Sequence, residues 1–123
     1  MGSEQVCQGG ETLIFACSGA ADVGAIADIA ARKLTKEGIG KMFCLAGVGG
    51  RVAPIMEKTK AATQILAIDG CGLDCVRCTL DQAGIANYEQ IRVTDLGLVK
   101  GQSPATDANA EVVVTQGKAM LNS

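Results

Sequence analysis

The residues of this chain best able to do chemistry are its six cysteines, because histidine is absent. Without an imidazole, the chain has no histidine for acid–base catalysis, for activation of a cysteine nucleophile or for metal ligation. Three of the thiols lie close together at Cys71, Cys75 and Cys78, in the stretch from Gln64 to Gly84. The sequence therefore points to sulfur chemistry, in the form of a metal thiolate site, a reactive thiol or a redox pair.

Two further cysteines, Cys17 and Cys44, each lie at the end of an earlier apolar run, as Cys71 does, and the three are equally spaced along the chain. If these runs are parallel strands, their carboxyl ends meet at one edge of the sheet. Cys75 lies about one helical turn beyond Cys71 and reaches the same point. These four thiols predict a tetrahedral, four-cysteine site for Zn²⁺, with Zn–S distances of about 2.3 Å. The same four thiolates suit an iron–sulfur cluster.

Apolar runs alternate with amphipathic segments along the chain. Strands are expected at 12–16, 41–46, 63–68 and 88–93, and helices at 22–37, 53–61, 73–82 and 107–121. The unit of strand, turn and helix recurs about every 25 to 30 residues, which is the length of a βαβ unit. The predicted fold is therefore α/β, a single three-layer domain with an open, four-stranded parallel sheet of Rossmann-like βαβ repeats. Residues 1–11 are expected to be a flexible lead-in, and residues 12–123 a cysteine-rich metal-binding domain.

Three details of this prediction depend on local sequence. Residues 88–93 alternate polar and apolar side chains, which is typical of a half-exposed edge strand. The glycine-rich segment at 47–50 is expected to be a loop after the second strand. The last segment is predicted to be a helix, although the three valines at 112–114 also suit a strand.

Several thiolates in one place carry negative charge that their surroundings must offset. The helices that start near Asp22 and Leu73 direct backbone N–H groups toward the thiols, with Ser18 or Asp22 as a cap. Glycine turns allow further N–H groups to approach the sulfurs. The residues expected around the sulfurs are Ser18, Gly19, Gly47, Asp69, Gly70 and Gly72. Cys78 either replaces Cys44 as a ligand, resolves a disulfide or simply packs.

Three motifs also occur together and in order. They are Cys17-Ser18-Gly19-Ala20 followed by Asp22-Val23-Gly24, then Cys44-Leu45-Ala46-Gly47-Val48-Gly49-Gly50, then Asp69-Gly70-Cys71. Over about residues 16–84 the chain thereby resembles the DGC-domain family, named for its Asp-Gly-Cys motif, to which zinc chelation by four cysteines is ascribed. The resemblance implies that Cys17, Cys44, Cys71 and Cys75 chelate zinc, and it implies no known reaction. Cys78 departs from the family pattern and leaves open a five-thiol or redox-modified site.

Two other functions compete with metal binding. The segment from Cys71 to Arg77 satisfies the Cys-x5-Arg spacing with which cysteine phosphatases and arsenate reductases surround an oxyanion, although Asp74 would repel an anion there. Alternatively, Cys71, Cys75 and Cys78 form a redox switch, with Cys75 and Cys78 as the closest pair. Neither a Rossmann nor a P-loop glycine fingerprint is present, which argues against nucleotide binding.

Charge and hydropathy exclude further classes of function. The net charge is −2 and the eleven lysines and arginines are scattered, so the chain lacks the basic patch of a nucleic-acid-binding protein. No apolar run approaches the roughly 20 residues that cross a bilayer, and residues 1–12 lack the features of a signal peptide. The expected location is the cytoplasm, where the reducing environment favours free or metal-bound thiols over disulfides.

Overall fold

The computed structural model describes residues 10–121. Its elements are β1 (Thr12–Ala16), α2 (Asp22–Lys36), β2 (Lys41–Met42), α3 (Leu45–Gly49), α4 (Ala53–Ala61), β3 (Gln64–Asp69), α5 (Cys75–Gln82), β4 (Glu89–Arg92), the 3₁₀ helix η1 (Val93–Leu96) and α6 (Asp107–Leu121). Residues 1–9, which make up most of the predicted lead-in and include Cys7, lie outside the described part of the chain.

The strands form one four-stranded parallel sheet in the order β2-β1-β3-β4. This confirms the predicted α/β class and the parallel sheet, and it places β4 at an edge as the alternation in its sequence indicated. The two central strands, β1 and β3, are buried along almost their whole length and pair from Thr12 with Gln64 to Ala16 with Ile68. They are therefore the most firmly supported part of the sheet.

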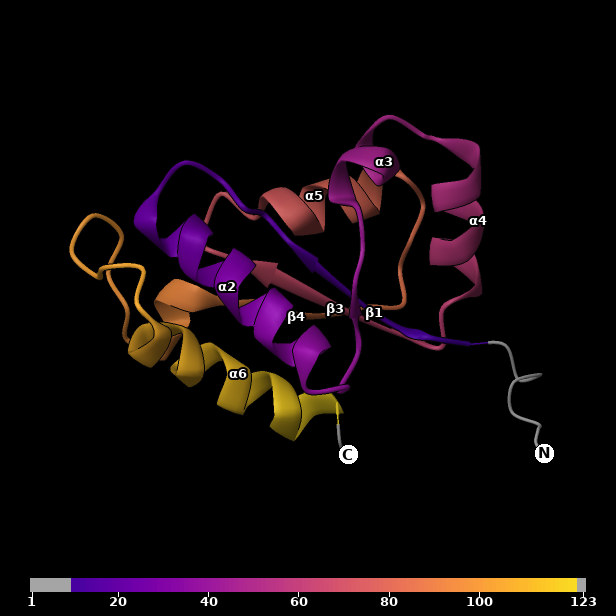
Figure 1. Ribbon diagram of the computed structural model, residues 1–123. Helices are drawn as coiled ribbons and strands as arrows, with labels where there is room; N and C mark the ends of the chain where they lie inside the picture. The colour runs from indigo at the N-terminus through magenta and orange to yellow at the C-terminus, as the bar shows by residue number, and fades with distance from the viewer. Residues whose placement is uncertain (1–9, 122–123) are drawn as a thin grey trace.

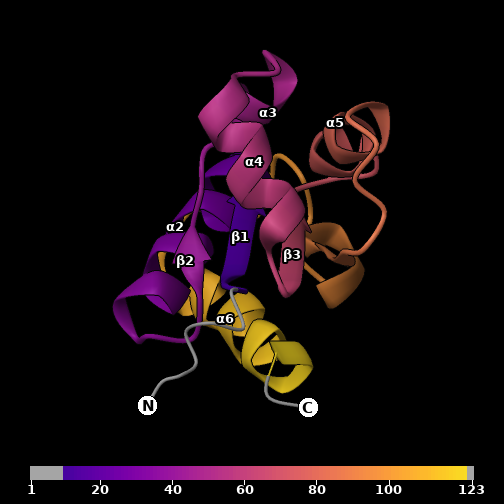
Figure 2. The same cartoon turned by 90° about the vertical axis from the view of Figure 1, so that its right-hand side faces the viewer.

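Helices cover both faces of the sheet, which gives the three layers that were predicted. Figures 1 and 2 show α2 and α6 on one face and α3, α4 and α5 on the other. Each face has its own core, because side chains alternate along a strand. Ile14 and Leu66 face α2 and α6, whereas Leu13, Phe15 and Ala67 face α3 and α5. Both cores are almost entirely aliphatic.

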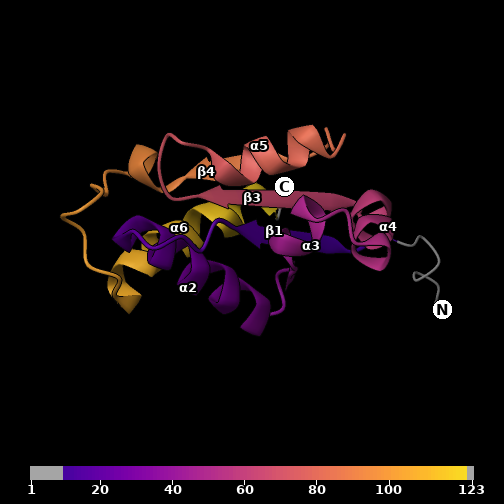
Figure 3. The same ribbon diagram turned by 90° about the horizontal axis from the view of Figure 1, so that it is seen from above.

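The order of the strands creates a switch point at the carboxyl ends of β1 and β3. From β1 the chain crosses through α2 to β2, on one side, whereas from β3 it crosses through α5 to β4, on the other side. Where neighbouring strands connect in opposite directions, the loops at their carboxyl ends separate and leave room for a ligand. Figure 3 shows the turns after β1 and β3 at this end of the sheet, with the loop between η1 and α6 beyond them.

The second strand and the segment after it differ from the prediction. The second strand was expected at 41–46, but β2 ends at Met42, and one further hydrogen bond of the sheet joins Phe43 N–H to Ile14 O at 2.8 Å. The segment 47–50, which was expected to be a loop, belongs mostly to the short helix α3. Two glycines in five residues disfavour a helix by propensity alone. The helix forms because Val48 is fully buried in the core on this face and Gly47 packs under Ile55.

The C-terminal segment is the helix α6, which resolves the ambiguity of its valines. Val113 and Val114 are fully buried against the sheet, whereas Val112 is 42% exposed, as expected for one helical face. The helix α2 packs closely on α6, with Leu34 of α2 beside Gly117. No helix between residues 10 and 121 is long and apolar enough to cross a membrane.

Candidate thiol site

Cys17 and Cys71 lie on either side of the switch point, at the ends of the paired strands β1 and β3. Cys17 extends the ladder of β1 by donating its N–H to Ile68 O at 3.1 Å. Its sulfur accepts the N–H of Gly70 at 3.3 Å, so the turn after β3 is folded onto the Cys17 thiol. Strand pairing thus places the Cys17 thiol beside the turn that carries Cys71.

The glycine of the Asp-Gly-Cys motif is required by close backbone packing. A Cβ atom on Gly70 would lie 2.8 Å from Val23 C and 2.9 Å from Gly24 N, in the first turn of α2. A Cβ atom on Gly24 would in turn lie 2.8 Å from the backbone of Gly19. Backbone therefore packs directly against backbone where the turns after β1 and β3 meet the start of α2, and only glycine fits there. The Cys17 sulfur lies beside this contact.

The aspartate of the same motif caps α5 from outside that helix. Asp69 is 1% exposed, and its carboxylate accepts the N–H groups of Val76 at 2.7 Å and Arg77 at 3.2 Å. These are the second and third residues of α5, so Asp69 satisfies the donors that an N-cap side chain normally satisfies. Gln90 of β4 donates a third hydrogen bond to it at 3.0 Å. Because α5 begins at Cys75, this contact fixes the position of the Cys75 thiol.

The residue at the N-cap position itself, Asp74, is directed elsewhere. It has a left-handed backbone with φ of 55°, and its carboxylate accepts a forked pair of bonds from Arg92, at 3.0 Å from Nε and 2.8 Å from Nη2. Gln90 donates to it at 2.9 Å. The hydrogen bond from Arg92, followed by that from Gln90, lowers the pKa of Asp74 despite some desolvation. The loop between Cys71 and Cys75 is thereby tied to β4.

The pKa of Cys75 depends on the groups around its thiol. Partial desolvation of the sulfur, although the residue as a whole is exposed, raises the pKa of Cys75. The neighbouring Cys17, Asp69, Cys71 and Cys78 raise this pKa further. Three thiols and a carboxylate therefore act on Cys75 at the start of α5, and Cys44 is not among them.

A lysine from the loop between η1 and α6 contacts this group of thiols. Lys100 Nζ lies 3.5 Å from Cys71 Sγ. The next residue, Gly101, donates its N–H to the carboxylate of Asp22 at 2.9 Å, and this bond, the largest influence, lowers the pKa of Asp22. The loop is thus fastened to the first residue of α2 with Lys100 over Cys71. Sequence reasoning missed Lys100, Gln90 and Arg92, since only the tertiary fold brings them here.

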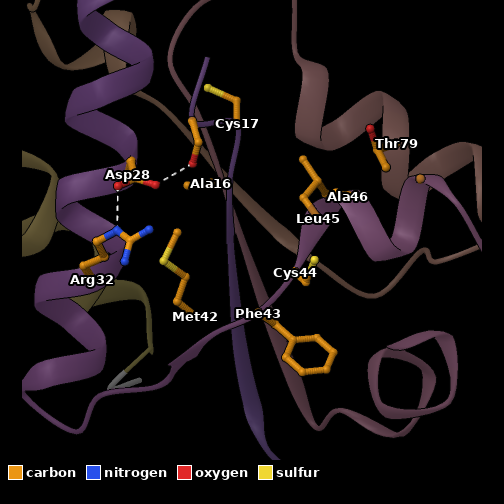
Figure 4. Close-up of a pocket in the computed structure, with 12 residues that line it drawn as sticks. Ala16, Cys17, Asp28, Arg32, Met42, Phe43, Cys44, Leu45, Ala46 and Thr79 are labelled. Atoms are coloured by element: carbon orange, nitrogen blue, oxygen red, sulfur yellow. Dashed lines mark hydrogen bonds and ion pairs between the residues drawn. The ribbon is translucent and has the colours of Figure 1, made fainter. Parts of the chain in front are cut away.

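Cys44 occupies a different setting from the other candidate ligands. It is the N-cap of α3, it is exposed, and its sulfur accepts the N–H of Gly47 at 3.3 Å. Together with Cys17 it lines a cavity of about 760 Å³ between α2 and α3. Figure 4 shows the two side chains at different ends of this cavity, with their sulfurs turned away from each other.

The donor set suits a thiophilic metal, but the thiols are not gathered around one point. Among residues 10–121, no group of three or more Cys, Asp or Glu side chains is arranged to hold a metal ion. The chemistry of the donors nevertheless fits zinc, because Cys17 and Cys44 each accept a backbone N–H, as thiolate ligands do. Of the glycines expected near the sulfurs, Gly70 and Gly47 donate these bonds, whereas a Cβ on Gly19 or Gly72 would meet open space.

The remaining sequence features have local explanations in the structure. The N–H groups of Val76 and Arg77, which an oxyanion cradle over Cys-x5-Arg would need, are already bonded to the buried Asp69 carboxylate. This arrangement disfavours the phosphatase and reductase hypothesis. Cys78 is exposed, so it does not pack in a core, and its thiol lies 3.9 Å from Leu73 O. Ser18 has φ of 52° and bonds to Asp28 rather than capping α2.

Comparison with known proteins yields two matches. The sequence profile of the DGC domain matches residues 13–116, which extend from β1 into α6. The anaerobic and virulence modulator AnvM of Pseudomonas aeruginosa is 34% identical over 88 residues, which are 72% of this chain and 67% of AnvM. No solved structure matches the chain.

Proposed function

This chain belongs to the DGC-domain family, as its motifs predicted, and we propose that it binds a thiophilic metal ion, Zn²⁺ first among the candidates. The ligands in this proposal are Cys17, Cys44, Cys71 and Cys75. The observation that carries it is the placement of Cys17, Cys71 and Cys75 beside the switch point between β1 and β3, where an α/β sheet binds its ligands. Bound zinc would neutralise the thiolates without redox chemistry of its own.

The chain holds each of these thiols by a separate device. Strand pairing and the Gly70 N–H place Cys17, while the buried Asp69 carboxylate places Cys75 at the start of α5. Lys100 supplies positive charge beside Cys71. In a cluster of thiolates, such a nearby cation and such N–H donors lower the cost of bringing negative charges together.

Cys44 is the fourth proposed ligand, because α3 is fastened to α5. The Arg51 guanidinium donates to Val48 O at 2.9 Å, near the end of α3, and to Gln82 O at 2.8 Å, at the end of α5. The helix capped by Cys44 and the helix that begins at Cys75 are therefore tied at their other ends. Coordination by Cys44 would require its sulfur to leave the Gly47 N–H and turn toward the other thiols.

The proposed ion serves a function beyond folding. Each face of the sheet buries an ordinary aliphatic core, so a metal is not the only source of stability for this fold. The relative AnvM is named an anaerobic and virulence modulator, which supports a regulatory role for this chain in preference to a metabolic one. A thiol site of this kind suits such a role, since oxidation of its sulfurs would release the metal.

The test is elemental analysis of protein purified without added metal, combined with titration of free thiols. We expect about one equivalent of zinc and loss of reactivity at the four ligand thiols, which Co²⁺ substitution would report as thiolate-to-metal absorption. Less than about a tenth of an equivalent, with all thiols reactive and no uptake of Zn²⁺ or Co²⁺ by reduced protein, would overturn the proposal. A coloured protein with sulfide would instead identify an iron–sulfur cluster.

A second candidate is a redox switch, favoured by the exposure of Cys75 and Cys78 in the first turn of α5. Their separation of three residues places them on neighbouring positions of one helical face. Mild peroxide is expected to join them before either reaches sulfinic acid, as mass spectrometry of the peptides would show. Cys78→Ser is the matched variant, and peroxide-dependent loss of zinc that persists in this variant would remove the pair from the mechanism.

A further inference from the structure

The cavity between α2 and α3 is larger than a metal ion needs. Its volume is about 760 Å³, which lies within the range of cavities that bind small organic ligands. Met42, Phe43 and Leu45 form apolar parts of its lining, and the polar groups are few. Cys17 and Cys44 are both part of its lining, whereas Cys71 and Cys75 are not. This cavity therefore differs from the place where the thiols of α5 gather.

An arginine presents a free hydrogen-bonding edge at the side of the cavity. Arg32 forms its ion pair with Asp28 through Nε alone, at 2.7 Å, and the other oxygen of Asp28 is held by Ser18 Oγ at 2.7 Å. Within residues 10–121, Nη1 and Nη2 of Arg32 have no hydrogen-bond partner. Figure 4 shows the guanidinium pointing from α2 toward Met42 and the cavity. Such an edge is suited to a carboxylate, which it binds with two parallel bonds.

A thiol lies on the other side of the same cavity. Cys44 is exposed, whereas Cys17 is half-buried and its sulfur is bonded to Gly70. Figure 4 shows Arg32 and Cys44 on opposite sides, with Met42 between them. A ligand that fills this space would carry an anionic group at one end, a sulfur that reacts with a thiol at the other, and an apolar part between the two.

We propose that this cavity binds small disulfides that carry carboxylates, and that Cys44 exchanges with them to form a mixed disulfide. The Cys44 thiolate attacks one sulfur of the bound disulfide, a new bond forms between Cys44 Sγ and that sulfur, and the disulfide bond of the ligand breaks. The other half of the ligand leaves as a thiolate, so the electrons balance without a further oxidant. A small thiol reverses the step. The reaction proceeds in metal-free protein and does not rest on the proposed zinc site.

The experiment compares an anionic and a neutral probe on reduced protein freed of metal by a chelator. Glutathione disulfide is the anionic probe and bis(2-hydroxyethyl) disulfide is the neutral one. Peptide mass spectrometry measures the initial rate of modification at each cysteine. The exposed Cys78 lies outside the cavity and serves as an internal reference in the same chain. Arg32→Gln removes the anion-binding edge, and Lys36→Gln, one turn further along α2, removes the same charge outside the cavity lining.

We expect the ratio of Cys44 to Cys78 modification to be about fivefold higher with the anionic probe than with the neutral one, the size of a partly exposed charge-assisted pair. The preference should disappear in Arg32→Gln and remain in Lys36→Gln. Equal ratios for the two probes, or a preference that survives Arg32→Gln, would overturn the proposal. The same assay on zinc-loaded protein shows whether Cys44 is also a metal ligand. Slower exchange at Cys44 than in metal-free protein supports the proposed function. An unchanged rate contradicts the proposed function but not the binding of disulfides.

Discussion

Cys17 and Cys71 follow the carboxyl ends of β1 and β3, which are buried and fully paired, whereas Cys44 follows β2, an edge strand of two residues. We refer to the first arrangement, with Cys75, as the central half of the thiol site and to Cys44 with α3 as the outer half. In the central half, contacts from distant parts of the chain fix each thiol. In the outer half, the Cys44 sulfur is bonded only within its own short helix among the described residues.

This difference suggests a division of labour within one site. The central half is built on interlocked backbone and a buried carboxylate, which fix the backbone that carries its thiols. The outer half opens into a cavity and can adjust, which is suited to exchange of a ligand. Sites that must release what they bind commonly combine a rigid part with one that moves.

The largest expected effect is the loss of Zn²⁺ affinity when a thiol of the central half, rather than of the outer half, is removed. Cys71→Ser should weaken Zn²⁺ binding by about 100-fold, since it removes one of four thiolate ligands from the rigid half. Cys44→Ser should weaken it by only about tenfold, because that thiol must reorient to bind. Competition with a chromophoric chelator measures both constants, and Cys78→Ser is the control without effect. Equal losses for Cys44→Ser and Cys71→Ser would show that the two halves do not differ.

The next effect tests the backbone packing of the central half. Gly70→Ala should lower the free energy of unfolding by about 2–3 kcal/mol, because the added methyl group overlaps the backbone of α2, which cannot move aside as a side chain could. Gly72→Ala, two residues away, meets open space and has no positive φ, so its effect should stay within about 0.5 kcal/mol. Urea unfolding measures both. A Gly70→Ala variant as stable as wild type would refute the interlocked packing.

The contact between Arg92 and Asp74 predicts a smaller effect that depends on pH. Arg92 lowers the pKa of Asp74 below its ordinary 3.8, so the bond stabilises the fold fully above that value and is lost as pH falls through the lowered pKa. Arg92→Met should therefore destabilise the fold at pH 7 and do so progressively less below about pH 4. Urea unfolding at several pH values measures the stability difference between Arg92→Met and the wild type. Asp95→Asn is the control, because it removes only the second, exposed ion-pair partner of Arg92. A cost independent of pH would indicate lost packing instead.

The smallest expected effect concerns the lysine over Cys71. Lys100→Met should weaken Zn²⁺ binding by about two- to threefold, with little change in stability, since the contact is exposed and screened by solvent. Lys60→Met, on the exposed surface of α4, removes the same charge far from the thiols and should leave the affinity unchanged. If the two variants behave alike, Lys100 does not act on the site.

Much of the central half was predictable from the sequence. The apolar runs that become β1 and β3 are continuous, so their strand character and shared edge followed from composition alone, and with them the proximity of Cys17 and Cys71. The Asp-Gly-Cys motif marked the correct turn. Its mechanism was not predictable, because Asp69 bonds to amides seven and eight residues away, and Gly70 is needed by a helix far earlier in the chain.

The outer half was predicted less well, for a physical reason. A loop was expected at 47–50 because glycine disfavours helix, yet burial of Val48 outweighs that preference. Likewise, the sequence contains Arg32, Asp28 and Cys44 without indicating that they share a cavity. Arg32 and Asp28 lie on α2 whereas Cys44 caps α3, and only the packing of α2 and α3 against the sheet brings them to one cavity.

Residue types and the periods at which they recur were enough to establish the family, the α/β class, the parallel sheet and the sulfur-only chemistry. What surrounds each thiol depends instead on how the elements pack: the cap from Asp69, the charge of Lys100 and the cavity beside Cys44. Such contacts join positions far apart in the chain, and local preferences do not specify which distant residues will meet.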